Sequence, residues 1–244
     1  MIGWRGHLGK IAPGIQACRV VREFYEVVPE GIDLSLATLT VHKIARDSMD
    51  GLRKPMLEAA ELLALRGVDA IYLGGVPPIV IREPGYDLQL IAEIEELTGR
   101  PASTAVSTCM EAFRRFGIQR MVMAAPFEDW VINSIKTYYA ASGFDIVHMK
   151  GMPLITGTER FALPLDAEYT FTRQVFRECS EKVDGIYIPC GGWGTVYNVE
   201  RLEQDLGKPV ITWFNSMIWW FLHKYGVKAP IRGFGSLLES LSTR

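Results

Sequence analysis

The stretch Gly185-Ile186-Tyr187-Ile188-Pro189-Cys190-Gly191-Gly192-Trp193-Gly194-Thr195 decides how the rest of the chain is organised. Its apolar run, residues 185–188, stops at Pro-Cys-Gly-Gly, the pattern of a buried parallel strand that ends in a glycine-rich loop. Cys190 would then lie at the carboxyl end of a strand, where open α/β sheets bind their ligands. Two interpretations of this thiol stay open: it is the reactive group of a site, or a small residue packed in the core.

The composition of the 244-residue chain is that of a globular protein with one large or two small domains. The formal net charge is −2 and no dense basic run occurs, so we expect no nucleic-acid partner. The most apolar run, residues 70–81, is too short for a membrane span and contains two adjacent prolines. Residues 1–14 lack the apolar core of a signal peptide, so we expect no membrane association.

The cysteines are widely spaced and include no Cys-x-x-Cys pair: Cys18, Cys109, Cys179 and Cys190. This pattern argues against a zinc or disulfide framework and favours a reducing, cytoplasmic location. The histidines show no metal-binding spacing either, and we place them on the surface or in packing: His7, His42, His148 and His223. We therefore predict no metal site.

Short β-rich apolar runs alternate with segments of helical periodicity along the whole chain. We predict strands over residues 10–16, 34–41, 68–73, 101–106, 120–124, 145–149, 185–188 and 210–213. We predict helices over residues 16–25, 47–67, 88–99, 108–117, 126–143, 166–182, 198–206 and 216–225, with residues 153–164 irregular. This alternation predicts parallel sheets built from right-handed βαβ units.

An internal repeat divides the chain. Val68-Asp69-Ala70-Ile71-Tyr72-Leu73-Gly74-Gly75 matches Val183-Asp184-Gly185-Ile186-Tyr187-Ile188-Pro189-Cys190 at an offset of 115 residues. Residues 99–101 match 207–209 at an offset of 108, and residues 116–117 match 225–226 at an offset of 109. Three landmarks at similar offsets favour duplication over the general self-similarity of α/β chains. In this register Cys190 corresponds to Gly75.

The duplication predicts an α/β fold of two similar domains, each with a parallel four-stranded sheet. Pseudo-twofold symmetry would relate the domains, with the active-site cleft between their strand tips. We place the first half at residues 1–117 and the second at residues 118–215. The C-terminal tail, residues 216–244, is expected to pack back on the first half.

The Pro-Cys-Gly-Gly strand tip, the twofold repeat and the Ala-Pro-Phe stretch at Ala125 resemble the aspartate/glutamate racemase superfamily. The resemblance spans nearly the whole chain and is strongest to the branch of arylmalonate decarboxylase and maleate cis-trans isomerase. In this superfamily the racemases and isomerases carry a cysteine at both strand tips, and the decarboxylases keep only the second, with glycine at the first. Gly75 and Cys190 match the decarboxylase pattern, which implies a cofactor-independent reaction next to a carboxylate.

Three positions depart from that pattern. The resemblance implies hydroxyl residues directly after the glycine and a tyrosine in the middle loop, which would hold the carboxylate and an enediolate. Here these positions are Val76, Pro77 and Phe127. The resemblance therefore implies the fold more firmly than the substrate.

Moving a proton at the carbon next to a carboxylate creates a negative charge that positioned donors must stabilise. Glycines after Cys190 allow close backbone approach, and residues at two corresponding helix starts offer hydroxyls and N–H groups. For the helix-start residues the alternative is capping alone. The predicted substrate contacts are Gly75, Val76, Ser107, Thr108, Phe127, Gly191, Gly192, Asn215 and Ser216.

The predicted catalytic residue is Cys190. As a thiol it would protonate an enediolate after loss of carbon dioxide, and as a thiolate it would abstract an α-proton. Two-base racemisation needs a second acceptor, which Gly75 does not supply, so a one-cysteine decarboxylation is favoured. The alternatives are a racemase or cis-trans isomerase with an unconventional second base, and a non-catalytic protein that binds small acids.

Other candidates are weaker. Cys109 follows a predicted helix start, where its pKa would be lowered if it faced the cleft. Cys18 and Cys179 fall on helix faces and are expected in the core. Trp193 belongs to the core or the cleft wall, and residues 76–86 form either a lid or an ordinary surface loop. The expected partner is a small carboxylic acid, with assembly into a homo-oligomer left open.

Overall fold

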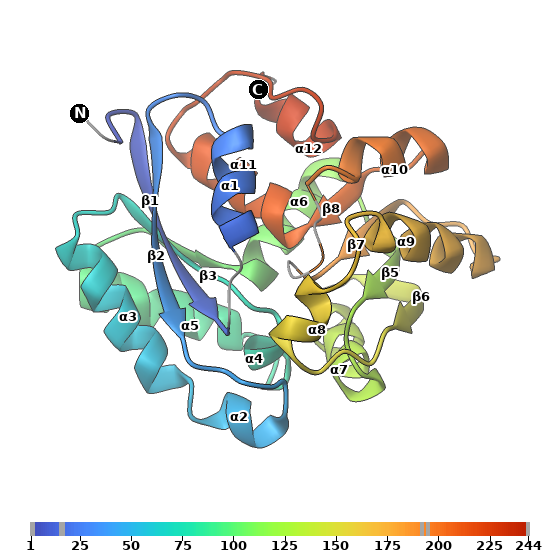
Figure 1. The fold of residues 1–244 in the computed structure, drawn as a ribbon, viewed down its shortest axis with the longest axis horizontal. Helices are drawn as coiled ribbons and strands as arrows, with labels where there is room; N and C mark the ends of the chain where they lie inside the picture. The colour runs from blue at the N-terminus through green and yellow to red at the C-terminus, as the bar shows by residue number, and fades with distance from the viewer. Residues whose placement is uncertain (1–2, 15–17, 191–192, 194–195, 243–244) are drawn as a thin grey trace.

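Two parallel four-stranded sheets form the framework of the computed structural model, which describes residues 3–14, 18–190, 193 and 196–242 (Figure 1). The first sheet has the order β2-β1-β3-β4 and the second β6-β5-β7-β8. The strands are β1 (Gly6–Pro13), β2 (Ile32–Leu39), β3 (Ala70–Leu73), β4 (Ala102–Thr104), β5 (Arg120–Ala125), β6 (Asp145–Gly151), β7 (Gly185–Ile188) and β8 (Val210–Thr212). The two orders are identical when the halves are aligned, which confirms the predicted α/β fold with duplicated sheets.

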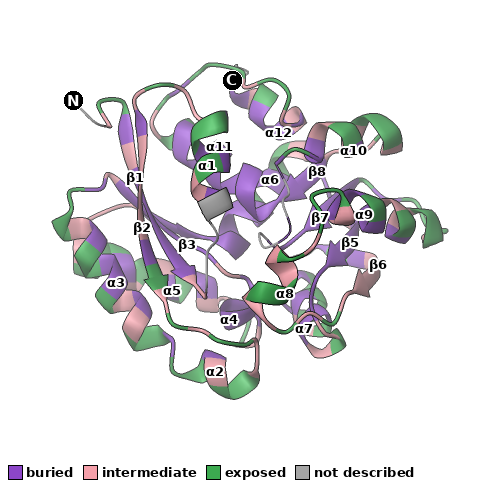
Figure 2. Ribbon diagram, viewed as in Figure 1, coloured by how far each residue is buried: buried purple, intermediate pink, exposed green. Residues whose placement is uncertain are grey.

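Helices pack on these sheets, whose central strands β1, β3, β5 and β7 are mostly buried (Figure 2). They are α1 (Cys18–Val27), α2 (Arg46–Asp50), α3 (Arg53–Leu65), α4 (Pro77–Val80), α5 (Tyr86–Thr98), α6 (Ala105–Phe116), α7 (Asp129–Ala140), α8 (Gly157–Phe161), α9 (Ala167–Glu178), α10 (Val199–Leu206), α11 (Trp213–Lys224), α12 (Ser236–Glu239) and the 3₁₀ helix η1 (Ser240–Ser242). Among the described residues, no helix is long and apolar enough to cross a membrane.

The repeat extends to individual hydrogen bonds. In the first half Glu95 Oε1 accepts from the N–H of Ala102 at 2.9 Å, which ties the end of α5 to the start of β4. In the second half Glu203 Oε1 accepts from the N–H of Val210 at 2.9 Å and ties α10 to β8 in the same way. The two carboxylates are 108 residues apart and make equivalent bonds. General α/β architecture does not require this, so the match supports duplication.

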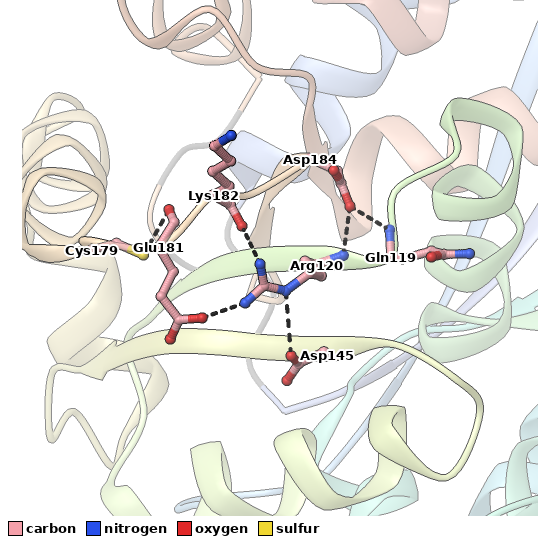
Figure 3. Close-up of polar contacts among 7 residues, drawn as sticks. All are labelled: Gln119, Arg120, Asp145, Cys179, Glu181, Lys182 and Asp184. Carbon is pink, nitrogen blue, oxygen red and sulfur yellow. Dashed lines mark hydrogen bonds and ion pairs between the residues drawn. The ribbon is translucent and has the colours of Figure 1, made fainter.

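The amino ends of the strands in the second sheet are held by surface polar contacts around Arg120 (Figure 3). Asp184 Oδ2 accepts from the N–H of Arg120 at 2.9 Å and from that of Gln119 at 3.1 Å. The Arg120 guanidinium donates to the carbonyl oxygen of Lys182 at 2.9 Å and pairs with Glu181. These contacts fix one end of β5 and β7, and the candidate site lies at the other.

Helices α6 and α11 begin directly after β4 and β8, three residues earlier than predicted. Thr104 is the N-cap of α6, and its Oγ1 accepts from the N–H of Ser107 at 3.0 Å. Thr212 is the N-cap of α11 and forms a capping box with Asn215. A threonine that ends each strand thus starts each helix, and the predicted helix starts at residues 108 and 216 are wrong.

Two segments predicted without regular structure contain helices. Residues 76–86 include α4, whose four residues are all buried and which packs against α7 of the second half, so they are no ordinary surface loop. Residues 153–164 include α8, which begins at a capping box between Thr156 and Glu159. Both segments border the cavity described below.

Helix α11 packs along α6, and α12 packs on α11 and β8. The C-terminal elements therefore contact both halves of the molecule. The domain boundaries at residues 117 and 215, and the assignment of the tail to the first half, stay predictions.

Candidate active site

A cavity of about 100 Å³ lies where the carboxyl ends of strands from both sheets meet. Pro13 ends β1, Gly75 follows β3, Phe127 follows β5 and Cys190 follows β7; all four line it, together with Trp213 at the start of α11. Ligands bind at this edge of open parallel sheets. Duplication places two such edges face to face, so the cavity draws its walls from both halves.

Several predicted site residues reach this cavity. Gly75, Val76, Phe127 and Cys190 line it, and Cys190 is only 9% exposed. Gly191 and Gly192 lie outside the described residues. Contact of the four lining residues with a substrate stays a prediction.

Gly75 has a backbone φ of +90°, a conformation that residues with side chains rarely adopt. A Cβ added to Gly75 would lie 2.9 Å from Cγ of Pro13. A cysteine here, as in the two-thiol members of the superfamily that this chain resembles, would be strained. The backbone at position 75 therefore favours the glycine that this chain has there over a cysteine.

The four predicted contacts from the helix starts are buried in packing and do not line the cavity. Ser107 Oγ donates to Asp87 Oδ2 at 2.6 Å, and Asn215 Nδ2 donates to the carbonyl oxygen of Val210 at 2.9 Å. Thr108 Oγ1 and Ser216 Oγ lie 3.2 Å apart, as α6 packs against α11. This geometry favours the capping and packing interpretation of these side chains.

The other described cysteines lie away from the cavity. Cys109 is fully buried, with Sγ 3.2 Å from Ser216 Oγ, and burial raises the pKa of its thiol to about 12. Cys179 lies near the amino ends of the second sheet and donates to the carbonyl oxygen of Glu181 at 3.7 Å (Figure 3). It is half-buried and packs against the edge of the core rather than inside it. The side chain of Cys18 lies outside the described part of the chain.

Lys10 is a candidate functional residue that the sequence interpretation missed. It lies in β1, is 1% exposed and lines the cavity. Its Nζ is 4.1 Å from the centre of the Trp213 ring. Burial lowers the pKa of this lysine to about 7, and the nearby Glu23 partly opposes that effect. A lysine flanked by Leu8, Gly9, Ile11 and Ala12 was the sequence signal that pointed to it.

The cavity lining is basic. Lys10 lies inside, the half-buried Arg160 lines the wall, and the exposed His42 and Lys43 lie where the lining meets solvent. None of the described lining residues is aspartate or glutamate. In a chain with a formal net charge of −2, this arrangement favours an anionic ligand.

Two loops from opposite halves meet beside the cavity. Lys43 and Thr156 form an isolated antiparallel bridge, and the N–H of Ile44 donates to the carbonyl oxygen of Ile155 at 2.9 Å. Arg160 of α8 is held by a bond from its Nη1 to the carbonyl oxygen of Leu154 at 2.8 Å. The loop after β2 and the segment around α8 thus complete the lining between the sheets.

Much of the remaining lining is apolar. It includes Val41, Met49, Pro78 and Phe161 together with Trp213. Such walls exclude water and strengthen electrostatic interactions inside the cavity.

Trp193, predicted in the core or the cleft wall, is fully buried and packs near Phe171, with ring centroids 5.8 Å apart. It does not line the cavity. In the part of the chain that the structure describes, no group of three or more His, Cys, Asp or Glu side chains is placed to hold a metal ion.

Comparison with known proteins agrees with this geometry. The family model described as arylmalonate decarboxylase matches residues 8–238. The arylmalonate decarboxylase of Bordetella bronchiseptica is 23% identical over 202 residues, which cover 82% of this chain and 84% of that protein.

Solved structures show the same fold. A mutant of arylmalonate decarboxylase in its liganded form has a TM-score of 0.86 at 19% identity, covering 95% of this chain and 98% of that one. The maleate isomerase of Pseudomonas putida S16 has a TM-score of 0.87 at 15% identity, covering 97% of this chain and 99% of that one. Since the family model spans nearly the whole sequence, this protein belongs to the arylmalonate decarboxylase family of enzymes.

Proposed function

We propose that this protein is a cofactor-independent, decarboxylase-like lyase that acts at the carbon next to a carboxylate, with Cys190 as the proton donor. The observation that supports this most is the place of Cys190 on the cavity wall, in a site that has glycine at position 75. Of the described cysteines, the other two lie elsewhere. One thiol is sufficient for decarboxylation followed by protonation from one face.

The reaction would proceed in two steps. The bond between the α-carbon and the leaving carboxylate breaks, carbon dioxide departs, and the electron pair stays with the substrate as an enediolate. The S–H bond of Cys190 then breaks as its proton forms the new C–H bond. The resulting thiolate takes a proton from water, which restores the starting state.

The lining favours a substrate that is both anionic and partly apolar. Lys10 and Arg160 suit carboxylates, and the walls around Phe127 and Trp213 suit an apolar or aromatic substituent. A substituted malonate combines both properties, and the Bordetella relative is named for this class of acid. Arylmalonates are therefore the first substrates to test.

A racemase or cis-trans isomerase is the second candidate. It needs another proton acceptor near Cys190, and Lys10, whose pKa is lowered to about 7, offers one. The maleate isomerase fold supports this alternative, and a cysteine-to-serine mutant of the maleate cis-trans isomerase of Nocardia farcinica carries a covalently bound succinylcysteine. The third, a non-catalytic acid-binding protein, draws support from the apolar Val76, Pro77 and Phe127. The cytoplasmic location and the oligomeric state stay predictions.

The test is a screen of malonates, maleate, 2-substituted acids and amino acids in deuterated water. Release of carbon dioxide with one deuterium at the α-carbon supports the lyase, and exchange or isomerisation without carbon dioxide supports the second candidate. Cys190→Ser should abolish either activity, and Cys179→Ser should not. Binding without turnover or exchange would contradict both catalytic proposals.

A further inference from the structure

We propose that Lys10, as an ammonium, binds the carboxylate that the substrate retains and stabilises the enediolate that forms from it. The lysine would take the place of the side-chain hydroxyls missing at Val76, Pro77 and Phe127. This inference rests on the proposed function, because it assumes an acid that develops charge next to Cys190.

The strand places Lys10 at the cavity. Side chains alternate along a strand, so Lys10 and Ala12 share a face of β1, and both line the cavity. The lysine stem runs past Gly74, where an added Cβ would lie 3.4 Å from Lys10 Cε and 3.0 Å from the carbonyl oxygen of Ile11. Glycine at position 74 thus leaves the space that the stem occupies.

The end of the side chain is held at the cavity wall. Its Nζ lies over the face of Trp213, itself a lining residue, and the interaction favours the charged form of the amine. Glu23 of α1 also favours that form. Burial opposes both by disfavouring the charged form. A bound anion would therefore stabilise the ammonium further.

The other cations of the lining are less suited to this role. Lys43 is exposed, where water weakens its interaction with an anion. Arg160 is half-buried, so water reaches it more than it reaches Lys10. Lys10 is the cation at 1% exposure, where a charge interaction is strongest.

Decarboxylation makes this interaction selective for the transition state. Before the reaction the retained carboxylate carries one negative charge, and as carbon dioxide leaves, the electron pair adds a second. An ammonium fixed beside these oxygens interacts more strongly with the enediolate than with the substrate, which accelerates the reaction. Loss of Lys10 should therefore lower kcat more than it raises KM.

The same arrangement predicts proton uptake on binding. At a pH above 7 much of the ligand-free Lys10 is neutral, and an anion beside it would draw a proton from solvent. The titratable groups to control for are Glu23 on α1, Glu168 on α9, which interacts with Glu23, and Cys190 and His42 in the lining.

The experiment measures phenylmalonate binding to Cys190→Ser, which prevents turnover, by calorimetry in buffers of different ionisation enthalpy. We expect uptake approaching one proton at pH 8 and near zero at pH 6. Adding Lys10→Met should weaken binding at least tenfold and remove the uptake. Lys10→Arg should retain binding without uptake, because arginine stays protonated. Glu168→Gln and the surface variant Lys54→Met should leave the uptake unchanged.

Melting curves show whether Lys10→Met loses binding because it misfolds. A second variant, Lys10→Met with Glu23→Gln, removes both buried charges, so that Glu23 is not left without its cation. The proposal is overturned if uptake persists without Lys10, if Lys10→Met binds as tightly as its parent, or if no acid in a panel of malonates and monocarboxylates binds.

Turnover separates this inference from the proposed function. If Cys190→Ser is inactive and Lys10→Met keeps the kcat of the wild type, the role of Lys10 fails and the lyase stands. If the wild type converts no acid, the lyase fails, and the proton uptake still decides whether Lys10 binds the carboxylate.

Discussion

The amino group of Lys10 lies 4.1 Å from the centre of the Trp213 ring, although the two residues are far apart in the chain. Lys10 comes from the first strand of the first half, and Trp213 begins the helix that follows the last strand of the second. The contact joins the two halves at the cavity and holds a buried amine against an aromatic face. It makes the charge state of Lys10 dependent on the packing of α11.

Trp213→Leu should lower the pKa of Lys10 in the ligand-free protein, and with it the pH at which proton uptake on ligand binding begins. The ring stabilises the ammonium by about 0.5–1 kcal/mol, so its loss should shift this pH down by about half a pH unit. Calorimetric proton uptake across pH 5.5–9 measures the shift. Trp213→Phe keeps an aromatic face and should shift it less; an unchanged onset in Trp213→Leu would show that the ring has no such role.

Cys190→Ser should reduce turnover by about 10²–10⁴-fold, the range expected for loss of a proton-transfer group. Its melting temperature should stay within about 2 °C of the wild type, because the exchange is small and adjoins the cavity. Initial rates of carbon dioxide release and thermal melting check the two expectations. Cys179→Ser is the matched control, and equal loss of activity in both variants would argue against a specific role for Cys190.

Gly75→Cys should destabilise the protein rather than create an efficient two-thiol site. The positive φ and the contact with Pro13 predict a cost of about 1–3 kcal/mol. Chemical denaturation measures that cost. Gly51→Ala, where φ is −83° and no atom lies within 4 Å of an added Cβ, should be nearly neutral. An undiminished stability of Gly75→Cys would mean that the backbone relaxes there.

Glu168→Gln should stabilise the protein at high pH. Burial raises the pKa of Glu168 from 4.5 to about 8, so the stability that this carboxyl contributes is present below pH 4.5 and is lost as the pH rises through 8. Glutamine cannot ionise, and Asn198 still lies beside it. The melting temperature of the variant should match the wild type near pH 4.5 and exceed it by about 10 °C at pH 9.

The exposed Glu61→Gln is the control for this pH dependence and should show no such difference. A Glu168→Gln variant that is less stable than the wild type at pH 9 would mean that the ionised carboxylate is stabilising, contrary to its buried surroundings.

Thr108→Val should leave KM unchanged, because Thr108 packs between α6 and α11 and does not line the cavity. Losing its bonds to Thr104 and Ser216 should cost about 1 kcal/mol of stability. Substrate saturation curves and denaturation measure the two effects. A tenfold rise in KM without loss of stability would return Thr108 to the substrate site, as the sequence first suggested.

The repeat could be predicted from the sequence because apolar strands and the glycines that end them are local signals. They predicted two similar four-stranded sheets and placed Gly75 and Cys190 at corresponding strand ends, and the structure supplied the shared strand order. Both residues line one cavity because parallel strands of a duplicated unit present their carboxyl ends together.

The starts of α6 and α11 were predicted too late because a threonine both ends the strand and caps the helix, with no loop to mark the change. That error made Thr108 and Ser216 look like the first residues of their helices. Their hydroxyls instead face each other across a helix pair that only tertiary packing brings together.

The sequence by itself determined the duplicated fold and the strand-tip cysteine, since both depend on residues that are neighbours in the chain. Only the tertiary structure decided that Lys10 is buried in the cavity, because its surroundings come from α1 and α11, at opposite ends of the sequence. In an isolated strand a lysine is surrounded by water and keeps its usual pKa. Its pKa is lowered only when distant segments exclude water from it.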